Sequence, residues 1–397
     1  MIVKDRVRSQ VVLLGPALVA AAAYVDPGNV ASNTAAGARY GYLLVWVVVC
    51  ANLMAGLVQY LSAKLGVLTG QSLPELLRDR LPRAGRYAYW LQAEVVTMAT
   101  DLAEVLGGAL ALALLFDLPL LWGGIVTTAV STLLLAVRTR RFEGLVIALL
   151  AVVAIGFVAG LFVAPPDPGG TLAGLVPAFA GGDSVLLAAA MLGATVMPHA
   201  VYAHSALARD RHGQAGPRLL SATRIDVTFA LLVAGAVNLS LLLLGATALG
   251  GDSQTGTIEG VHAAVGAHLG AGVALLFAVG LLCSGLASTA VGSYAGGVVM
   301  GGLLHRTVPL VVRRLVTAVP ALVVLAVGVD PTAALILSQV VLSFGIPFAL
   351  IPLVVMTSSR AVLGAARNRP GTTVAAVVVC AAIVGLNLTL LGSTFLP

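Results

Sequence analysis

The stretch AAAYVDPGNVASN, residues 21–33, decides the architecture of this chain. It lies inside the first long apolar segment, yet it contains the carboxylate Asp26, followed at once by Pro27 and Gly28. Proline breaks a helix, and the backbone groups that it frees are tolerated in hydrocarbon only where they line a cavity or contact a ligand. An ionised Asp at the bilayer centre adds about 2.5 kcal/mol or more. A structural kink with a paired Asp is the alternative, but this segment offers no nearby Lys or Arg, so a functional break is favoured.

The composition places the chain in a membrane. Of 397 residues, 59% are hydrophobic and 10% are charged, and the mean hydropathy is +1.03. A soluble domain cannot bury that much apolar surface, so the chain is predicted to be a polytopic membrane protein. The first ten residues are mostly polar and lead straight into an apolar run without the pattern of a cleavable signal, so we expect the first span to be retained.

Windows of about twenty apolar residues predict eleven spans within one transmembrane domain, residues 1–397. Their approximate limits are 11–36, 42–66, 87–116, 120–137, 144–163, 184–208, 224–249, 268–302, 308–328, 332–357 and 373–395. All of the 22 basic residues except Arg39 fall in or beside the loops of one side. By the positive-inside rule the N-terminus is then cytoplasmic and the C-terminus is outside. The net charge of +6 follows from this topology and needs no nucleic-acid partner.

A second interrupted segment, GATVMPHAVYAHS at residues 193–205, lies in the sixth predicted span. It places Met197, Pro198 and His199 at the depth that Asp26 has in the first span. Interrupted segments at corresponding positions in two halves of a chain are typical of a transporter site. We therefore expect two inverted five-helix repeats, at about 11–163 and 184–357, followed by an extra helix at about 373–395.

The side chains at the two breaks suit a divalent transition metal ion. The Asp26 carboxylate and the Asn29 amide oxygen are hard ligands, whereas the Met197 thioether is soft and favours later transition metals over Ca²⁺ and Mg²⁺. This mixed set predicts Mn²⁺ or Fe²⁺ as the ion, with carbonyls of the unwound segments completing the coordination. Packing is the more common role of a lone Met, but its place opposite Asp-Pro-Gly-Asn favours coordination.

These motifs resemble the signature of the Nramp family of proton-coupled divalent metal transporters, which includes the bacterial MntH-type manganese and iron transporters. The matching stretches cover nearly the whole chain and are DPGN (26–29), GARYGY (37–42), MATDLAE (98–104), GATVMPH (193–199), GSYAGG (292–297) and SQVVLSFGIPFALIPL (338–353). The resemblance implies an all-α fold of the LeuT type, with a five-plus-five inverted repeat, an eleventh helix, and helices 1 and 6 broken at mid-membrane.

The resemblance also implies a set of metal ligands. The side-chain ligands fall on Asp26, Asn29 and Met197. The backbone-carbonyl ligands fall on Ala23 and Ala194, and a glutamine that joins in some states falls on Gln339. The chain departs from the family pattern at Gly297 and Gly301, where the family often has Gln and Glu. These positions lie toward the predicted cytoplasmic end, so the departures concern gating or rate and leave the metal ligands intact.

A stripe of carboxylates in the third span predicts a proton route. At about 100° per residue, Glu94, Thr97, Asp101 and Glu104 fall within roughly 80° of one helix face. Acids inside a span are expensive and commonly serve as proton relays, although a polar helix–helix seam is the alternative, above all for Glu94. Counter-charges for the stripe are available at Arg313 and Arg314. The Nramp resemblance places Asp101, Glu104, His199 and both arginines in the proton pathway.

Histidines near the second break have two possible roles. An imidazole changes charge near neutral pH, so His199 is expected to pass or hold a proton in preference to binding the metal. His204 either joins that route or hydrogen-bonds a neighbouring helix, and the sequence favours neither.

The resulting prediction is import of Mn²⁺, and also of Fe²⁺, Co²⁺ and Cd²⁺, with proton symport by alternating access in a bacterial cell membrane. No permanently bound cofactor and no oligomer are required. The alternatives are a Na⁺-coupled amino-acid or amine symporter of the same fold, a Mg²⁺-transporting Nramp relative, and a channel. An intramembrane metalloenzyme is disfavoured because the chain has no H-E-x-x-H or comparable ligand pair, and its three cysteines have no motif spacing.

Overall fold

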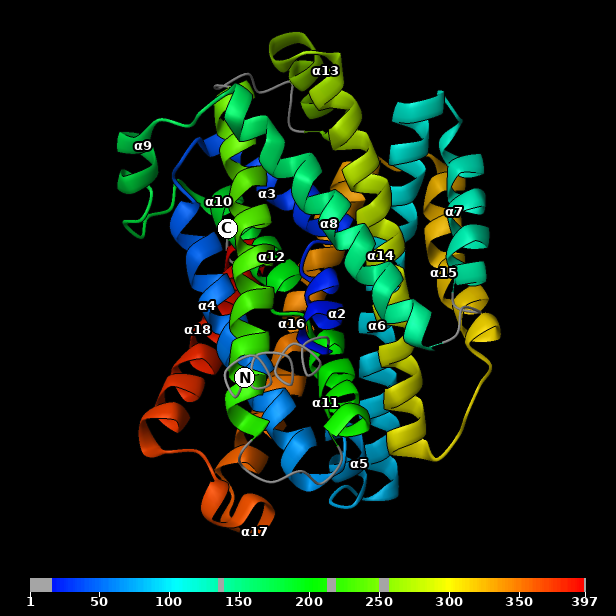
Figure 1. Cartoon of the computed structure of the whole chain (residues 1–397), viewed down its shortest axis with the longest axis vertical. Helices are drawn as coiled ribbons and strands as arrows, with labels where there is room; N and C mark the ends of the chain where they lie inside the picture. The colour runs from blue at the N-terminus through cyan, green and yellow to red at the C-terminus, as the bar shows by residue number, and fades with distance from the viewer. Residues whose placement is uncertain (1–15, 135–138, 213–218, 250–256, 396–397) are drawn as a thin grey trace, which may run out of the picture.

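A computed structural model of the chain describes residues 16–134, 139–212, 219–249 and 257–395. Within these ranges every regular element is helical, which confirms the predicted all-α class. The long helices form one upright bundle, and the short helices α2 and α3 lie across its interior (Figure 1).

The helices in chain order are α2 (Pro16–Ala23), α3 (Pro27–Tyr40), α4 (Val45–Thr69), α5 (Leu73–Arg78), α6 (Arg83–Phe116), α7 (Leu120–Leu134), α8 (Thr139–Val163), α9 (Pro168–Ala173), α10 (Gly182–Thr195), α11 (Pro198–His212), α12 (Leu219–Leu249), α13 (Ile258–Leu269), α14 (Ala271–Leu304), α15 (Leu310–Val327), α16 (Pro331–Ser358), α17 (Arg360–Leu363), the 3₁₀ turn η2 (Gly364–Ala366) and α18 (Pro370–Phe395).

Both predicted breaks are present. The first span divides into α2 and α3, because Asp26 has extended backbone angles and caps α3 while proline occupies the first helical turn. The sixth span divides into α10 and α11 on either side of Val196 and Met197. The chain therefore unwinds twice inside the bundle, at the two positions that the prolines indicated.

Nine helical stretches of the described residues are long and apolar enough to cross a membrane. Two of the eleven predicted spans are not among them. The first is divided into α2, with 8 residues, and α3, with 14, and neither piece reaches spanning length alone. The fourth is represented by the 15 residues of α7, and the rest of that prediction, residues 135–137, lies outside the described part, as do residues 11–15 of the first span. The count of eleven spans and the division into two repeats stay predictions.

Small residues let the helices approach closely around the breaks. A Cβ added at Gly107 of α6 would lie 2.1 Å from Cβ of Pro27, and one added at Gly193 of α10 would lie 1.9 Å from the carbonyl oxygen of Gln339 in α16. Helices in a membrane associate through such close packing because lipid provides no hydrophobic drive between them. These contacts fix α6 and α16 directly against the two broken segments.

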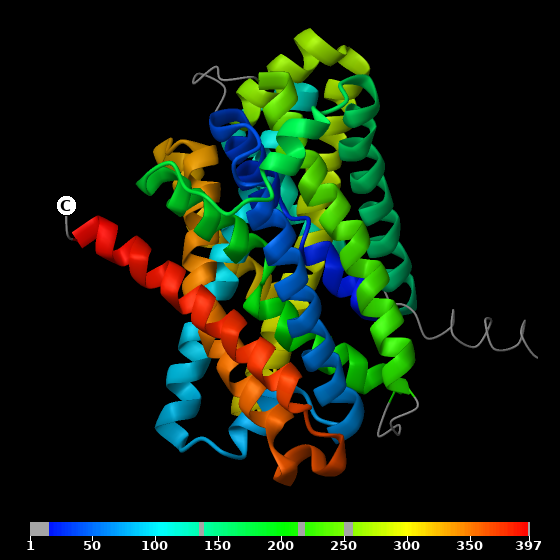
Figure 2. The ribbon, with the colours of Figure 1, turned by 90° about the vertical axis from the view of Figure 1, so that its left-hand side faces the viewer.

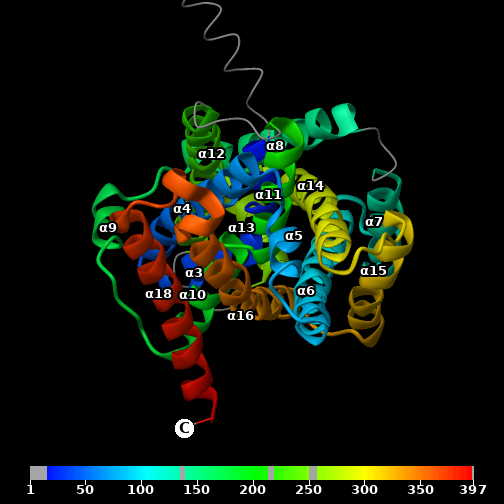
Figure 3. The same ribbon diagram turned by 90° about the horizontal axis from the view of Figure 1, so that it is seen from below.

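The outer helices do not reach the breaks. Figure 2 shows α18 running obliquely along the outside of the bundle, where it packs on α16, and Figure 3 shows α7 and α15 together at one side. Cys50, Cys283 and Cys380 are free thiols on separate helices, as their spacing predicted.

Candidate metal and proton site

The two breaks share one local pattern. Residues 23–27 read AYVDP and residues 194–198 read ATVMP, so an alanine precedes each proline by four positions and a candidate side-chain ligand precedes it by one. In an unbroken helix the amide of residue i+4 donates to the carbonyl of residue i, but proline has no amide hydrogen. The carbonyls of Ala23 and Ala194 therefore lose their helical donor at the two positions that the resemblance assigns to backbone ligands.

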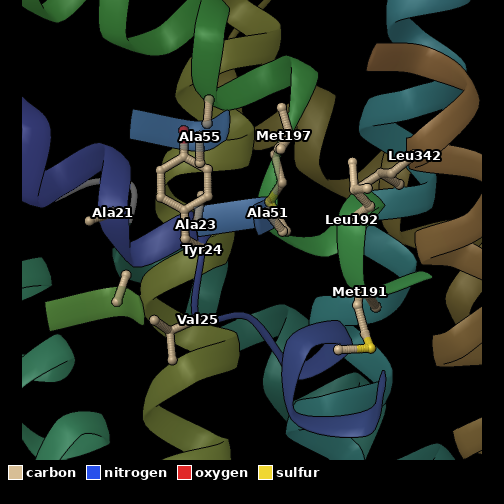
Figure 4. Packing of buried hydrophobic residues seen from close by; sticks show 14 of the residues in the cluster. Ala21, Ala23, Tyr24, Val25, Ala51, Ala55, Met191, Leu192, Met197 and Leu342 are labelled. Atoms are coloured by element: carbon tan, nitrogen blue, oxygen red, sulfur yellow. The ribbon is translucent and has the colours of Figure 1, made fainter. Parts of the chain in front are cut away.

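Neighbouring helices satisfy the other carbonyls of the first break. The Asn238 amide of α12 donates to the Tyr24 carbonyl at 2.8 Å, and the Ser284 hydroxyl of α14 donates to the Val25 carbonyl at 2.5 Å. Such side-chain donors hold an unwound segment in place within an apolar bundle. The interior around them is closely packed: Figure 4 shows Ala23, Tyr24 and Val25 with Met197 in one buried cluster.

The Asp26 carboxylate and the Ala194 carbonyl converge on Asn29. Oδ1 of Asp26 accepts from the Asn29 backbone amide at 2.7 Å and from its side-chain Nδ2 at 2.9 Å. The same Nδ2 donates to the Ala194 carbonyl at 2.8 Å, and the Thr195 hydroxyl donates to Oδ1 of Asn29 at 3.4 Å. Oxygen atoms from both breaks thus surround one small polar group, although 165 residues separate Asn29 from Ala194.

Gln339 approaches the same point from α16. Its Nε2 donates to Oδ2 of Asp26 at 3.3 Å, while its Oε1 is buried without a hydrogen-bond partner. A buried acceptor without a donor costs free energy, which a cation beside it would offset. Asp26, Asn29, Met197 and Gln339 are each 0% exposed, so solvent does not reach these side chains.

The metal chemistry rests on mixed donors. Among the described residues, no group of three or more His, Cys, Asp or Glu side chains is placed to hold a metal ion. The two breaks instead carry one carboxylate, amide oxygens, the freed alanine carbonyls and a thioether, and hydrogen bonds join Asp26, Asn29, the Ala194 carbonyl and Gln339 among them. Such a set can accept and release a divalent ion, whereas a resident catalytic metal normally has three firm protein ligands.

The carboxylates of α6 meet arginines of α15. Arg314, which is 0% exposed, lies 2.7 Å from Oδ1 of Asp101 and 3.7 Å from Oε2 of Glu104. The Ser288 hydroxyl of α14 donates to the other oxygen of Glu104 at 2.9 Å. One arginine between two buried acids leaves a net negative charge when both acids are ionised, so this cluster can hold an exchangeable proton.

Glu94 forms a separate pair with Arg313. Two nitrogens of Arg313 lie 2.8 and 2.9 Å from the two carboxylate oxygens, which is the bidentate geometry of a strong ion pair. The pair lies nearer the start of α6 than Asp101 and Glu104 do, and the Glu94 side chain is 13% exposed. This arrangement supports the polar helix–helix contact that the sequence analysis gave as the alternative role of Glu94. The partial exposure of Glu94 also leaves a path for a proton to the surface.

His199 lies between the metal site and the acids. Its Nδ1 is 3.2 Å from the Thr100 hydroxyl of α6, and its Nε2 is buried without a partner. Thr100 directly precedes Asp101 in the chain, so this contact brings the imidazole against the helix that carries the acids. His204 makes a different contact: its Nδ1 lies 2.5 Å from Oε1 of Gln59 in α4, which is the helix–helix hydrogen bond that the sequence allowed.

Several partners in this site were not predicted. Thr100, Ser288, Asn238 and Ser284 are single polar residues within apolar helices, and only that property could have drawn attention to them. Thr97, which the helical-face argument included, donates instead to the Ala93 carbonyl of its own helix.

The two departures from the family pattern lie together on the surface of one cavity. Gly297 and Gly301 of α14 line a space of about 350 Å³ with Glu75 of α5 and Arg209 of α11. A Cβ at Gly301 would meet nothing within 4 Å. The missing side chains therefore widen this cavity and do not alter the ligands of the metal site.

Fold and site together indicate a membrane transporter. Two helices broken inside an all-helical bundle, with buried polar groups meeting at the breaks, are the arrangement in which such proteins hold their cargo.

Comparisons with known proteins identify the family. The family model described as Nramp, natural resistance-associated macrophage protein-like, matches residues 17–393. The divalent metal cation transporter MntH of Mycobacterium tuberculosis is 58% identical over 388 residues, which cover 96% of this chain and 91% of that protein. The manganese transporter of Eremococcus coleocola superimposes with a TM-score of 0.85 at 30% identity, covering 96% of this chain and 86% of that one. The chain belongs to the Nramp family.

A more distant structure supports the fold alone. A transporter of the nucleobase-cation-symport-1 family matches 95% of this chain and 89% of its own with a TM-score of 0.62 at 16% identity. The LeuT-type fold implied by the sequence is thereby confirmed. Because the Nramp family consists of transporters, the prediction that the chain is not an enzyme is confirmed as well.

Proposed function

We propose that this protein imports divalent transition metal ions, with Mn²⁺ as the main substrate and Fe²⁺, Co²⁺ and Cd²⁺ as further substrates. The observation that carries the proposal is the convergence of Asp26, the Ala194 carbonyl and Gln339 around Asn29. A cation that binds there replaces Nδ2 of Asn29, and rotation of the amide turns its oxygen toward the ion. Met197, directly before the second proline, adds the soft donor that favours transition metals over Ca²⁺ and Mg²⁺.

Proton symport is the second part of the proposal. The proton moves between Asp26, His199, Asp101 and Glu104, with Arg314 holding the two acids and Arg313 holding Glu94 nearer the surface. The unpartnered Nε2 of His199 supports this order, because a buried ring nitrogen without a hydrogen-bond partner is available to take up or release a proton. A membrane potential of −100 mV already favours entry of a divalent cation by about 4.6 kcal/mol. Proton coupling therefore has to be measured and does not follow from the direction of transport.

The setting is a bacterial cell membrane, with the N-terminus in the cytoplasm and the C-terminus outside. The distribution of arginines supports this orientation. The transport cycle is alternating access, in which movement of α2 and α11 opens the closed pocket on the inner side. The protein needs no permanent cofactor, and the site lies within one chain.

The test is uptake of Mn²⁺ into proteoliposomes that contain a pH-sensitive dye. Wild type is expected to show saturable Mn²⁺ entry with internal acidification, and Asp26→Asn is expected to lose both. Asp167→Asn is the matched control, because Asp167 is an exposed cap of α9 far from the breaks and Asn also caps helices. Mn²⁺ entry without acidification would reject symport and keep the metal site.

Failure of Mn²⁺ uptake by correctly folded protein would favour one of the alternative functions. Uptake of an amino acid or amine with Na⁺ would identify a Na⁺-coupled symporter of organic substrates, and Mg²⁺ uptake insensitive to Mn²⁺ would identify a magnesium-transporting relative. Flux that does not saturate would indicate a channel.

A further inference from the structure

A groove runs along the outside of the bundle between α4 and α12. It encloses about 300 Å³ and is lined mainly by aliphatic side chains of the two helices, among them Leu57 and Leu231. Leu53 and Leu232, on its two rims, are 69% and 64% exposed. Because both helices cross the membrane, this apolar groove faces lipid hydrocarbon and fits an acyl chain.

One end of the groove is positively charged. The exposed Arg224 of α12 extends over Tyr60 of α4, with its Cζ 5.0 Å from the ring centroid. This cation–π contact holds the guanidinium in place and leaves its N–H groups free to donate. Lys64 follows one turn later on α4, and its charge repels that of Arg224.

In the described part of the chain, no carboxylate forms an ion pair with these two charges. The Lys64 ammonium donates to the neutral Asn368 at 2.9 Å. Lys and Arg side chains near the ends of membrane helices reach the headgroup region, where their charges attract anions. An anion bound at this end would compensate them.

The depth of the charges matches a lipid headgroup. Arg224 is five residues from the start of α12, and Lys64 is five residues from the end of α4, so each lies about 7.5 Å along its helix from that end. Lipid phosphates lie at this boundary between water and hydrocarbon. This is also the arginine-rich end that the proposed orientation places in the cytoplasm, where anionic lipids attract basic side chains.

We infer that the groove binds one anionic phospholipid, with its phosphate on Arg224 and one acyl chain between Leu57 and Leu231. Lys64 strengthens the positive field from its buried position without contacting the phosphate. The groove helices pack on the helices that follow the two breaks, α4 on α11 and α12 on α3. The lipid would therefore pack against α4 and α12, which in turn contact the helices that follow the two breaks.

The test is native mass spectrometry of the delipidated full chain, titrated with phosphatidylglycerol or with phosphatidylcholine of the same acyl chains. Wild type is expected to bind one phosphatidylglycerol at least about tenfold more tightly than phosphatidylcholine, which corresponds to about 1.4 kcal/mol. Arg224→Gln is expected to abolish this preference. Arg360→Gln is the matched control, because Arg360 is an exposed arginine at the same end of the bundle but outside the groove.

A second variant tests the acyl part of the site. Gly56 lies in the groove and a Cβ there would meet nothing within 4 Å, so Gly56→Leu places a side chain in the space proposed for the acyl chain. It is expected to weaken binding of both lipids while Arg224 is intact. Equal binding of the two lipids by wild type, or an unchanged preference in Arg224→Gln, would overturn the inference. Displacement of the lipid by inorganic phosphate, with Gly56→Leu having no effect, would show a simple anion site and would overturn it too.

Discussion

Gly28→Ala tests the role of Gln339 without altering any proposed metal ligand. A Cβ at position 28 would lie 1.9 Å from Nε2 and 2.2 Å from Cδ of Gln339. Ordinary contact begins at 3.4 Å, so the amide has to withdraw by about 1.5 Å. The clash is with the end of a flexible side chain, so the protein is expected to fold while Gln339 leaves Asp26.

The size of the effect follows from the support that Gln339 gives to the metal-bound carboxylate. Loss of a partner that orients a metal ligand typically weakens metal affinity by about 10–100-fold, and the long 3.3 Å separation of Nε2 and Oδ2 places this one at the lower limit. We therefore expect an approximately tenfold rise in the Kd for Mn²⁺, or about 1.4 kcal/mol. Isothermal titration of the purified protein with Mn²⁺ measures this directly.

The control is a double-mutant cycle with Gln339→Ala. If Gly28→Ala acts by displacing the glutamine, it has no further effect once the glutamine is absent, and the two substitutions are not additive. Full additivity, or an unchanged Kd in Gly28→Ala, would refute the reasoning that Gln339 supports the metal site.

Further predictions concern selectivity, coupling and stability. Met197→Ala should let Ca²⁺ or Mg²⁺ compete for Mn²⁺ uptake, since only hard ligands remain, and equal exclusion of Ca²⁺ would show that the thioether is not the filter. Asp101→Asn should lower proton flux by about tenfold or more while substantial metal flux persists, and unchanged acidification in dye-loaded proteoliposomes would remove Asp101 from the pathway. Arg314→Met should lower the free energy of unfolding by about 3 kcal/mol or more, because it leaves buried acids without a counter-charge, and adding Asp101→Asn should restore part of the loss in thermal melts. Burial alone would raise the pKa of Glu75, but hydrogen bonds from Ser72 and Arg209 outweigh it and hold the pKa below its ordinary value. Its stabilising contribution is then present above the unfolded pKa of about 4.3 and is lost as the pH falls through the lowered folded pKa, so the Tm difference between wild type and Glu75→Gln should shrink as the pH falls below about 4.3; a difference that stays constant below that pH would contradict this sign.

The breaks could be predicted from the sequence because proline acts locally. Pro27 and Pro198 each lack the backbone amide hydrogen that a helix needs, wherever the surrounding helices lie. Each break, and the candidate ligand that precedes its proline, could therefore be predicted without knowledge of the fold. The pairing of Arg313 and Arg314 with acids of α6 was also accessible, because charges inside a membrane are few and need partners.

The partners around the breaks depend on packing and could not be read in this way. A helical-face argument places Thr97 with the acids, but the neighbouring helix decides which threonine contacts His199, and the structure selects Thr100. Asn238 and Ser284 reach the first break from helices more than 200 residues later in the chain. Span counting has the same limit, since hydropathy does not show that the first span divides into pieces as short as α2.

The most direct test of the metal site is anomalous diffraction from crystals of this protein soaked in Mn²⁺. The account predicts one anomalous peak between the two breaks, within bonding distance of the Asp26 carboxylate, the Ala194 carbonyl and the Met197 sulfur, and no peak there in Asp26→Asn. A protein that transports Mn²⁺ but shows its peak elsewhere, or shows the same peak in Asp26→Asn, would contradict the account.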